Sequence, residues 1–131
     1  MTVKVYYEDT DAVGVVYYAN YLRFMERCRT DWLHNLGYDV HAMTQQYGVL
    51  FAVRSASIDY LKPARLSDIL TITVNLTGLR RVSLDVAQDV YRGEELLCRG
   101  RVRLASLRSD TFDPSAIPAP ILTEIEKWKM P

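Results

Sequence analysis

Two different spacings of hydrophobic residues divide the chain. From Tyr21 to Leu36 the apolar residues recur at intervals of three and four, which is the spacing of an amphipathic helix. The apolar stripe is wide, so we expect this helix to be covered on most sides. Asn20 is a plausible N-cap for it, and Gly37 is expected to end it. The stripe consists of Tyr21, Leu22, Phe24, Met25, Cys28, Trp32, Leu33 and Leu36.

Most of the remaining chain alternates between apolar and polar residues, as β-strands do. In 69–77, Leu70 and Ile72 fall on one face, with Val74 and Leu76 continuing that face. Thr77-Gly78 is expected to begin a short connection. Arg92-Gly93-Glu94-Glu95 indicates a hairpin turn. The expected strands are 2–7, 49–61, 69–77, 82–91 and 96–106.

This order of elements predicts one domain of the α+β class over residues 1–131. A five-stranded antiparallel sheet wrapped around one long central helix would bury the helix and one face of the sheet. The far face, with Arg99, Arg101 and Arg103, is polar and can stay wet or meet another subunit. Unpaired sheet edges favour dimerisation. Residues 39–47 predict a short helix or a loop, and 121–129 a short terminal helix.

Composition narrows the possible functions. The 131 residues carry 16 basic and 16 acidic side chains, a balance that argues against nucleic acid or a membrane surface as the partner. No signal peptide and no apolar run long enough to span a membrane is visible. Cys28 and Cys98 are expected to be buried, reduced thiols, which favours a cytoplasmic location.

An acidic turn directly precedes the long helix. Glu8, Asp9 and Asp11 lie in this turn, and the helix start offers unpaired N–H groups and the positive end of the helix dipole. A base or nucleophile beside such donors could act on a carbonyl group. By composition alone, however, an Asp in a turn is more often a residue that binds nearby backbone N–H groups.

The stretch Tyr6-Tyr7-Glu8-Asp9-Thr10-Asp11-Ala12-Val13-Gly14-Val15-Val16-Tyr17-Tyr18-Ala19-Asn20-Tyr21 resembles the signature of the 4-hydroxybenzoyl-CoA thioesterase family. The following Leu22-Arg23-Phe24-Met25-Glu26-Arg27-Cys28-Arg29-Thr30 resembles its Tol-Pal-associated branch, the YbgC-type acyl-CoA thioesterases. Tyr60-Leu61-Lys62-Pro63-Ala64-Arg65-Leu66-Ser67-Asp68 matches a second family segment. The likeness covers about residues 3–108. It departs from the pattern at Tyr18, where many members of the branch carry His, and at Val13, where Gly is common.

The resemblance implies the hotdog fold and hydrolysis of an acyl-CoA thioester without cofactor or metal. It assigns the catalytic carboxylate to Asp11 and the oxyanion donor to the backbone N–H of Tyr18. It places Arg80 and Arg81 where the family contacts CoA phosphates, with Lys62 and Arg65 as further cations. It also implies a homodimer or a tetramer built as a dimer of dimers, with the active site across the dimer interface.

Several alternatives stay open at this stage. A second hotdog clade keeps its catalytic carboxylate on the central helix, where Glu26 is the rival, although its neighbours Arg23 and Arg27 favour a paired structural role. His34 and His41 have no second ligand nearby, so we expect no metal site. The chain could instead be a non-catalytic module that binds acyl-CoA or acyl carrier protein or scaffolds lipid-synthesis enzymes. A dehydratase is a further alternative, although its chemistry needs a His beside the carboxylate and none lies in residues 1–33. The acyl group, and direct attack or general-base action by Asp11, are undetermined.

Overall fold

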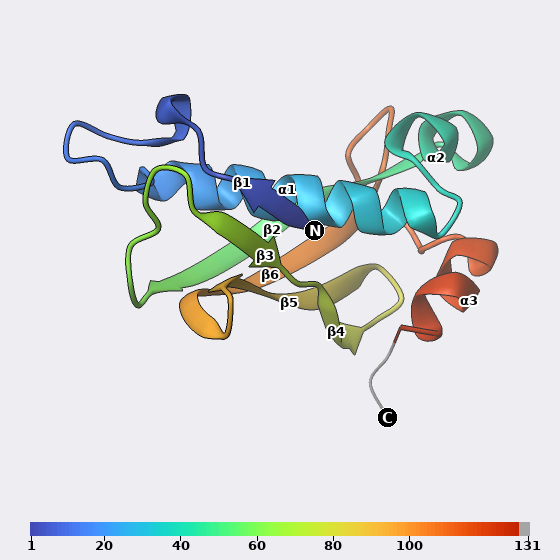
Figure 1. Cartoon of the computed structure of the whole chain (residues 1–131). Coiled ribbons are helices and arrows are strands. Elements are labelled where there is room, and N and C mark those ends of the chain that lie inside the picture. Colours follow the sequence, from blue (N-terminus) through green and yellow to red (C-terminus); the bar gives the residue numbers. More distant parts are fainter. Residues whose placement is uncertain (129–131) are drawn as a thin grey trace.

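The computed structural model describes residues 1–128, with the side chain of Val40 left out. A single antiparallel sheet curves around one long helix, and two short helices pack near one end (Figure 1). The elements in chain order are β1 Thr2–Lys4, the 3₁₀ turn η1 Tyr7–Asp9, α1 Tyr18–Asn35, α2 Val40–Tyr47, β2 Val49–Tyr60, β3 Ile69–Ile72, β4 Asn75–Leu79, β5 Ser83–Arg92, β6 Glu95–Arg108 and α3 Ala119–Glu126.

The sheet has six strands in five positions. Its order is β1-β3-β5-β6-β2, and β4 also pairs with β5, so β3 and β4 follow one another along the same edge of β5. The expected strand 69–77 is therefore broken between Ile72 and Asn75, although Leu70, Ile72 and Leu76 do face the core. β1 is shorter than expected, because the chain turns into η1 after Val5.

Two sequence expectations about turns had opposite outcomes. The expected connection at Thr77-Gly78 is wrong, because the pairing with β5 shifts by one residue between Leu76 and Gly78 and β4 continues to Leu79. A β-bulge of this kind inserts one extra residue into a strand, and the pairing continues beyond it. The hairpin Arg92–Glu95 is confirmed, with Gly93 at φ +61°, a backbone conformation that favours glycine.

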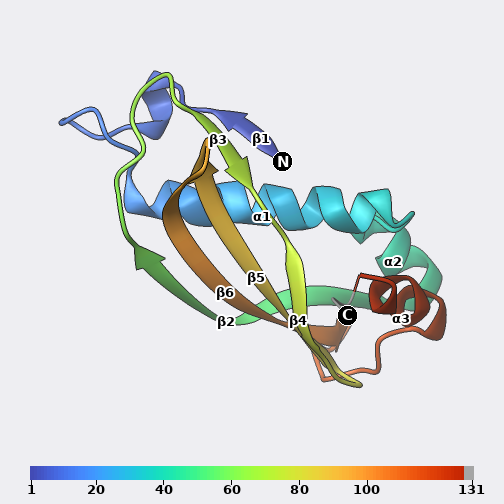
Figure 2. The ribbon, with the colours of Figure 1, turned by 60° about the horizontal axis from the view of Figure 1, so that its bottom comes forward.

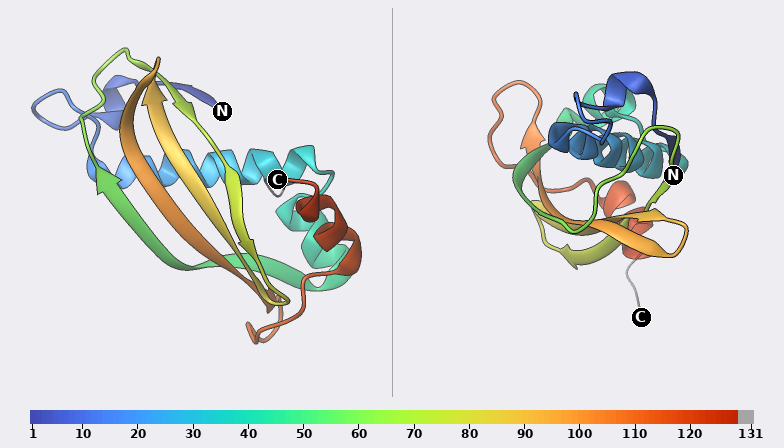
Figure 3. Two further views of the ribbon diagram at one scale, coloured as in Figure 1. Left: turned by 90° about the horizontal axis from the view of Figure 1, so that it is seen from below. Right: turned by 60° about the vertical axis from the view of Figure 1, so that its left-hand side comes forward.

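Helix α1 lies across the concave face of the sheet, as Figure 2 shows from below and Figure 3 from one end. It begins at Tyr18 with Tyr17 as N-cap, so the expectation that Asn20 caps it is wrong. The Asn20 side chain is instead buried inside the helix, where its Nδ2 donates to the carbonyl of Asp9 at 2.9 Å. Gly37, at φ +90°, follows the end of α1 as expected.

The core forms between α1 and the sheet in two clusters along the helix. Tyr21, Phe24 and Met25 fill the cluster near the helix start, and Trp32 and Leu33 fill the one near its end. Cys28 and Cys98 are buried free thiols, as expected. The expected stretch 39–47 forms the helix α2 from Val40 to Tyr47, and the terminal helix spans Ala119–Glu126; the last residue of the expected span 121–129 lies outside the described residues. None of the helices in residues 1–128 is long and apolar enough to cross a membrane.

Candidate active site

Asp11 opens a tight hairpin loop between η1 and α1. The loop is closed by a bridge between Thr10 and Val16 and by the Asp11 N–H, which donates to the carbonyl of Val15 at 2.9 Å. Gly14, at φ +80°, supplies the left-handed residue of the turn. The side chain takes part as well, because its Oδ1 accepts the N–H of Val13 at 2.9 Å and of Val15 at 3.4 Å.

Only one oxygen of the Asp11 carboxylate serves the loop. Within residues 1–128 the structure gives Oδ2 no hydrogen-bond partner, and the side chain is exposed. Asp11 therefore fulfils the structural expectation for a turn Asp through Oδ1 and keeps its second oxygen available for chemistry. The hydrogen bonds to Oδ1 also fix the direction in which Oδ2 points.

Hydrogen bonds fasten the loop to the start of α1 and to the connection between β2 and β3. The carbonyl of Asp9 accepts the N–H of Tyr17 at 3.0 Å and the side-chain amide of Asn20 at 2.9 Å. The N–H of Val16 donates to the carbonyl of Ala64 at 2.8 Å, which joins the loop to the β2–β3 connection. Asp11 and the first turn of α1 thus belong to one hydrogen-bonded unit.

The first turn of α1 presents unused donors. In the part of the chain that the structure describes, the N–H groups of Tyr18 and Ala19 have no acceptor, as expected at a helix start. Tyr18 is 65 % exposed, and its ring packs on that of Tyr60 with 4.6 Å between ring centroids. The Tyr60 hydroxyl donates to the carbonyl of Tyr18 at 3.3 Å, and partial burial raises the Tyr60 pKa, so the phenol stays protonated.

Tyr60 was not among the residues singled out from the sequence. It lies 42 positions from Tyr18 in the chain, and only the packing of β2 against α1 brings the two rings together. Local sequence pattern carries no signal for such a contact. Tyr60 nevertheless begins the second family segment, which could have suggested it.

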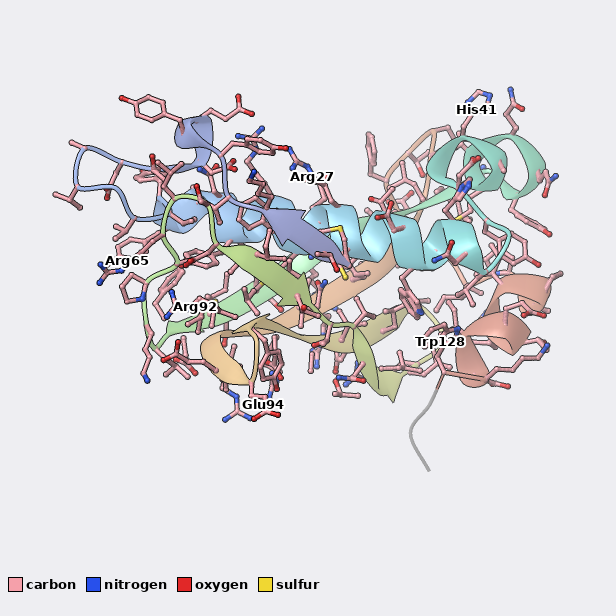
Figure 4. The ribbon with its side chains drawn as sticks, viewed as in Figure 1. Arg27, His41, Arg65, Arg92, Glu94 and Trp128 are labelled. Atoms are coloured by element: carbon pink, nitrogen blue, oxygen red, sulfur yellow. The ribbon has the colours of Figure 1, made fainter. Side chains whose placement is uncertain are left out.

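The four basic candidates do not gather at one place. Lys62 and Arg65 lie in the β2–β3 connection at the Asp11 end, where Arg65 forms a bridge with Val15. The Lys62 ammonium is engaged by Glu95 at 2.8 Å, which lowers the Glu95 pKa to about 2. The Arg65 guanidinium points away from the ribbon (Figure 4).

Arg80 and Arg81 lie at the opposite end of the molecule from the Asp11 loop. They lie in the turn between β4 and β5, at the end of the sheet away from the Asp11 loop (Figure 2 and the left view of Figure 3). Arg80 is bonded to Asp85 at 2.8 Å, whereas Arg81 is exposed and has no ion-pair partner within residues 1–128. Within one chain these arginines and Asp11 cannot contact the same ligand group.

A cavity of about 530 Å³ runs between α1 and β2. The rival carboxylate Glu26 lines it, is exposed, and forms no ion pair in the described part of the chain. The expected pairing of Glu26 with its arginine neighbours is therefore not seen. His41 lies in α2, away from the Asp11 loop (Figure 4), and residues 1–128 hold no group of three His, Cys, Asp or Glu side chains that could bind a metal.

The sequence profile of the Thioesterase superfamily matches residues 13–99, about two thirds of the chain. The chain belongs to this superfamily. The Acyl-CoA thioester hydrolase YbgC of Escherichia coli is 38 % identical over 126 residues, which cover 95 % of this chain and 93 % of that protein. A 1,4-dihydroxy-2-naphthoyl-CoA hydrolase of Thermosynechococcus vestitus is 39 % identical over 87 residues, covering 66 % of this chain and 60 % of that protein.

The fold agrees with this assignment. The crystal structure of a probable thioesterase from Bartonella henselae superposes with a TM-score of 0.86 at 30 % identity, covering 90 % of this chain and 97 % of that one. The thioesterase therefore has the expected hotdog fold, and the resemblance seen in its sequence is confirmed. It is an enzyme of the thioester hydrolase class.

Proposed function

We propose that this thioesterase hydrolyses acyl-CoA thioesters, with Asp11 as the catalytic carboxylate and the N–H of Tyr18 as the oxyanion donor. The observation that carries the proposal is the Asp11 hairpin: it holds one free carboxylate oxygen and is bonded directly to the helix start that bears the unused N–H groups. The naming of the Escherichia coli relative as an acyl-CoA thioester hydrolase supports CoA esters as the substrate class.

The chemistry needs few groups, because a thioester carbonyl is reactive and a thiolate leaves readily. As a general base, Asp11 takes a proton from water, and the resulting hydroxide attacks the carbonyl carbon. Negative charge develops on the carbonyl oxygen and is stabilised by the N–H of Tyr18 and the helix dipole. Collapse breaks the C–S bond, and the proton passes from Asp11 to the CoA thiolate. As a nucleophile, Asp11 would instead attack the carbon directly and form an anhydride that water then opens.

The position of Arg80 and Arg81 supports a site shared between two chains. β2 is an edge strand, and within residues 1–128 its second edge is unpaired. If two copies pair antiparallel through β2, the end of one β2, beneath Tyr18, lies beside the start of the other. The β4–β5 turn of the second copy then approaches the Asp11 loop of the first. We propose that Arg80 and Arg81 of the second copy, with Arg65 of the first, bind the CoA phosphates.

A non-catalytic binding module is the second candidate, and the acidic loop disfavours it. A site that only binds the anionic CoA phosphates gains nothing from the carboxylates of Glu8, Asp9 and Asp11. The proposal also includes acyl carrier protein as a carrier of the thioester. A hydrolysis screen over aliphatic and aromatic acyl-CoAs and acyl carrier protein, read by thiol release, distinguishes these cases.

The decisive test is Asp11→Asn. The amide keeps the Oδ1 hydrogen bonds of the loop but can neither accept a proton nor attack, so kcat should fall by about a hundredfold or more. Glu8→Gln is the matched control, because Glu8 lies in the same acidic stretch, is exposed, and has no hydrogen-bond partner among the described residues. Full turnover by a folded Asp11→Asn variant would overturn the assignment, as would equal losses in both variants.

A further inference from the structure

The cavity between α1 and β2 contains a buried positive charge. Arg29, on the inner side of α1, is only 8 % exposed and lines the cavity. Its Nη1 donates to Oε1 of Gln88 at 2.9 Å, and Gln88, fully buried on β5, donates in turn to the carbonyl of Met25 at 2.9 Å. Within residues 1–128, Gln88 is the one hydrogen-bond acceptor of this guanidinium.

A single neutral acceptor is poor compensation for a buried guanidinium. Arg has five N–H donors, and removing its charge from water is unfavourable unless an anion or several acceptors replace the water. Burial lowers the Arg29 pKa, which reports the same cost. Glu26 lies on the same helix, and its negative charge favours the charged form of Arg29. No ion pair joins the two side chains within the described residues. The remaining N–H groups of Arg29 therefore have capacity for an oxygen acceptor from a ligand.

Most of the other residues that line the cavity are apolar, and Arg23, Glu26 and Thr30 of α1 are the remaining polar ones. Its walls include Leu22 and Leu33 of α1, Phe51 of β2 and Val102 of β6. Leu22 lies about one helical turn after Tyr18, so the cavity begins about one turn beyond the proposed oxyanion donor and continues along the helix. Arg29 lies eleven residues after Tyr18, which is about 16 Å along the helix axis. A ligand that starts at the Tyr18 N–H and ends at Arg29 is thus an extended molecule, apolar along its length and polar at its far end.

We propose that the Arg29–Gln88 pair determines acyl specificity by binding an oxygen acceptor, above all a carboxylate, at the far end of the acyl group. The inference rests on the proposed function, because it takes the thioester end of the ligand to lie at Asp11 and Tyr18. Two parallel N–H···O bonds from a guanidinium to a carboxylate would neutralise the buried charge. A terminal hydroxyl offers the same acceptor chemistry without the charge and should be preferred less strongly.

The test compares acyl-CoA substrates of equal length that end in a methyl, a hydroxyl or a carboxylate group. The measured quantity is the ratio of kcat/KM for the carboxylate-ended substrate to that for the methyl-ended one. Arg29→Met removes the charge and keeps the apolar volume, so this ratio should fall at least tenfold. Arg27→Met is the matched control, because Arg27 lies on the outer side of the same helix (Figure 4), and it should leave the ratio unchanged.

Gln88→Glu gives a second test that keeps Arg29 in place. The new carboxylate is isosteric with the amide and would pair with the guanidinium, so it should lower the ratio even if Arg29→Met does not fold. A ratio that neither variant changes, in an enzyme that hydrolyses methyl-ended substrates, would overturn this inference alone. Absence of hydrolysis for every acyl-CoA in the unmodified enzyme would instead overturn the proposed function.

Discussion

At the scale of single residues, two aspartates show how bonding decides what a carboxylate can do. Asp85, on β5, accepts from Arg103 at 2.8 and 3.2 Å and from Arg80 at 2.8 Å. These hydrogen bonds hold its pKa well below the usual range, so it stays ionised and has no oxygen left for a substrate. Asp11 is bonded through one oxygen to its own loop and retains the other. The difference explains why one carboxylate is structural and the other is a candidate base.

Asp85→Asn should lower the free energy of unfolding at pH 7 by about 1 kcal/mol, because two ion pairs are lost. The Asp85 pKa is lower in the folded protein than the ordinary 3.8, so its contribution is present above that pH and is lost as the pH falls toward the folded value. Urea unfolding of both proteins at pH 7 and pH 3 measures this effect.

The difference in free energy of unfolding between the unmodified protein and Asp85→Asn should therefore be smaller at pH 3 than at pH 7. Asp110→Asn is the control, since Asp110 pairs with Arg108 at a highly exposed position and should contribute little. An equal difference in unfolding free energy at both pH values would show that Asp85 does not stabilise the fold through its charge.

At the scale of elements, the close approach of α1 to β6 is set by one residue. A Cβ added at Gly100 would lie 2.9 Å from the Sδ and Cε atoms of Met25 and 3.0 Å from the carbonyl oxygen of Gln88. The helix can pack close to the sheet because Gly100 of β6 has a hydrogen atom where any other residue has a Cβ. Across the same contact between helix and sheet, Arg29 of α1 donates to Gln88 of β5 at 2.9 Å.

Gly100→Ala should destabilise the fold by about 1–3 kcal/mol, because the added methyl overpacks the contact between helix and sheet. The expected signature is a lower urea midpoint with an unchanged m-value. In a Met25→Ala background the same substitution should cost less, since part of the clash is removed. Equal costs in the two backgrounds would mean that Met25 does not set the spacing.

At the scale of the whole molecule, the long axis separates the proposed catalytic and phosphate-binding residues. α1 and β2 both run from one end to the other, so Asp11 lies at one end and the turn with Arg80 and Arg81 at the other (Figures 1 and 2). If two copies pair antiparallel, the Asp11 end of each copy lies beside the Arg80 and Arg81 end of the other. A dimer would then hold two equivalent sites, each with Asp11 from one copy and the arginines from the other.

Replacing Arg80 and Arg81 by Ala should raise KM for CoA esters more than it lowers kcat, because the phosphates lie far from the reacting carbonyl. When subunits with this double change are mixed with Asp11→Asn subunits, each mixed dimer should gain one complete site. At a low substrate concentration, the activity of the mixture should then rise well above that of either variant. In the mixed dimers it should approach half the activity of the unmodified enzyme. A mixture that shows only the mean of the two variants would place the arginines and Asp11 of each site in the same chain.

Much of this architecture could be predicted from local pattern. Spacing of three and four gave the long helix, alternation gave the strands, and Gly37 and Gly93 marked turns that need a left-handed backbone. The helix start was placed too late, because Asn20 has the chemistry of an N-cap but its side chain binds the Asp9 carbonyl. A polar side chain near a helix start can take either role, and sequence spacing does not distinguish them.

The sequence by itself determined the class of fold, the thioesterase resemblance and the acidic loop before the helix, because these follow from residues that are neighbours in the chain. Only the tertiary structure decided that Tyr60 packs on Tyr18, that Gln88 binds Arg29, and that Arg80 and Arg81 lie far from Asp11. Such contacts join residues tens of positions apart, and they depend on the register and curvature of the sheet, to which many weak packing interactions contribute together.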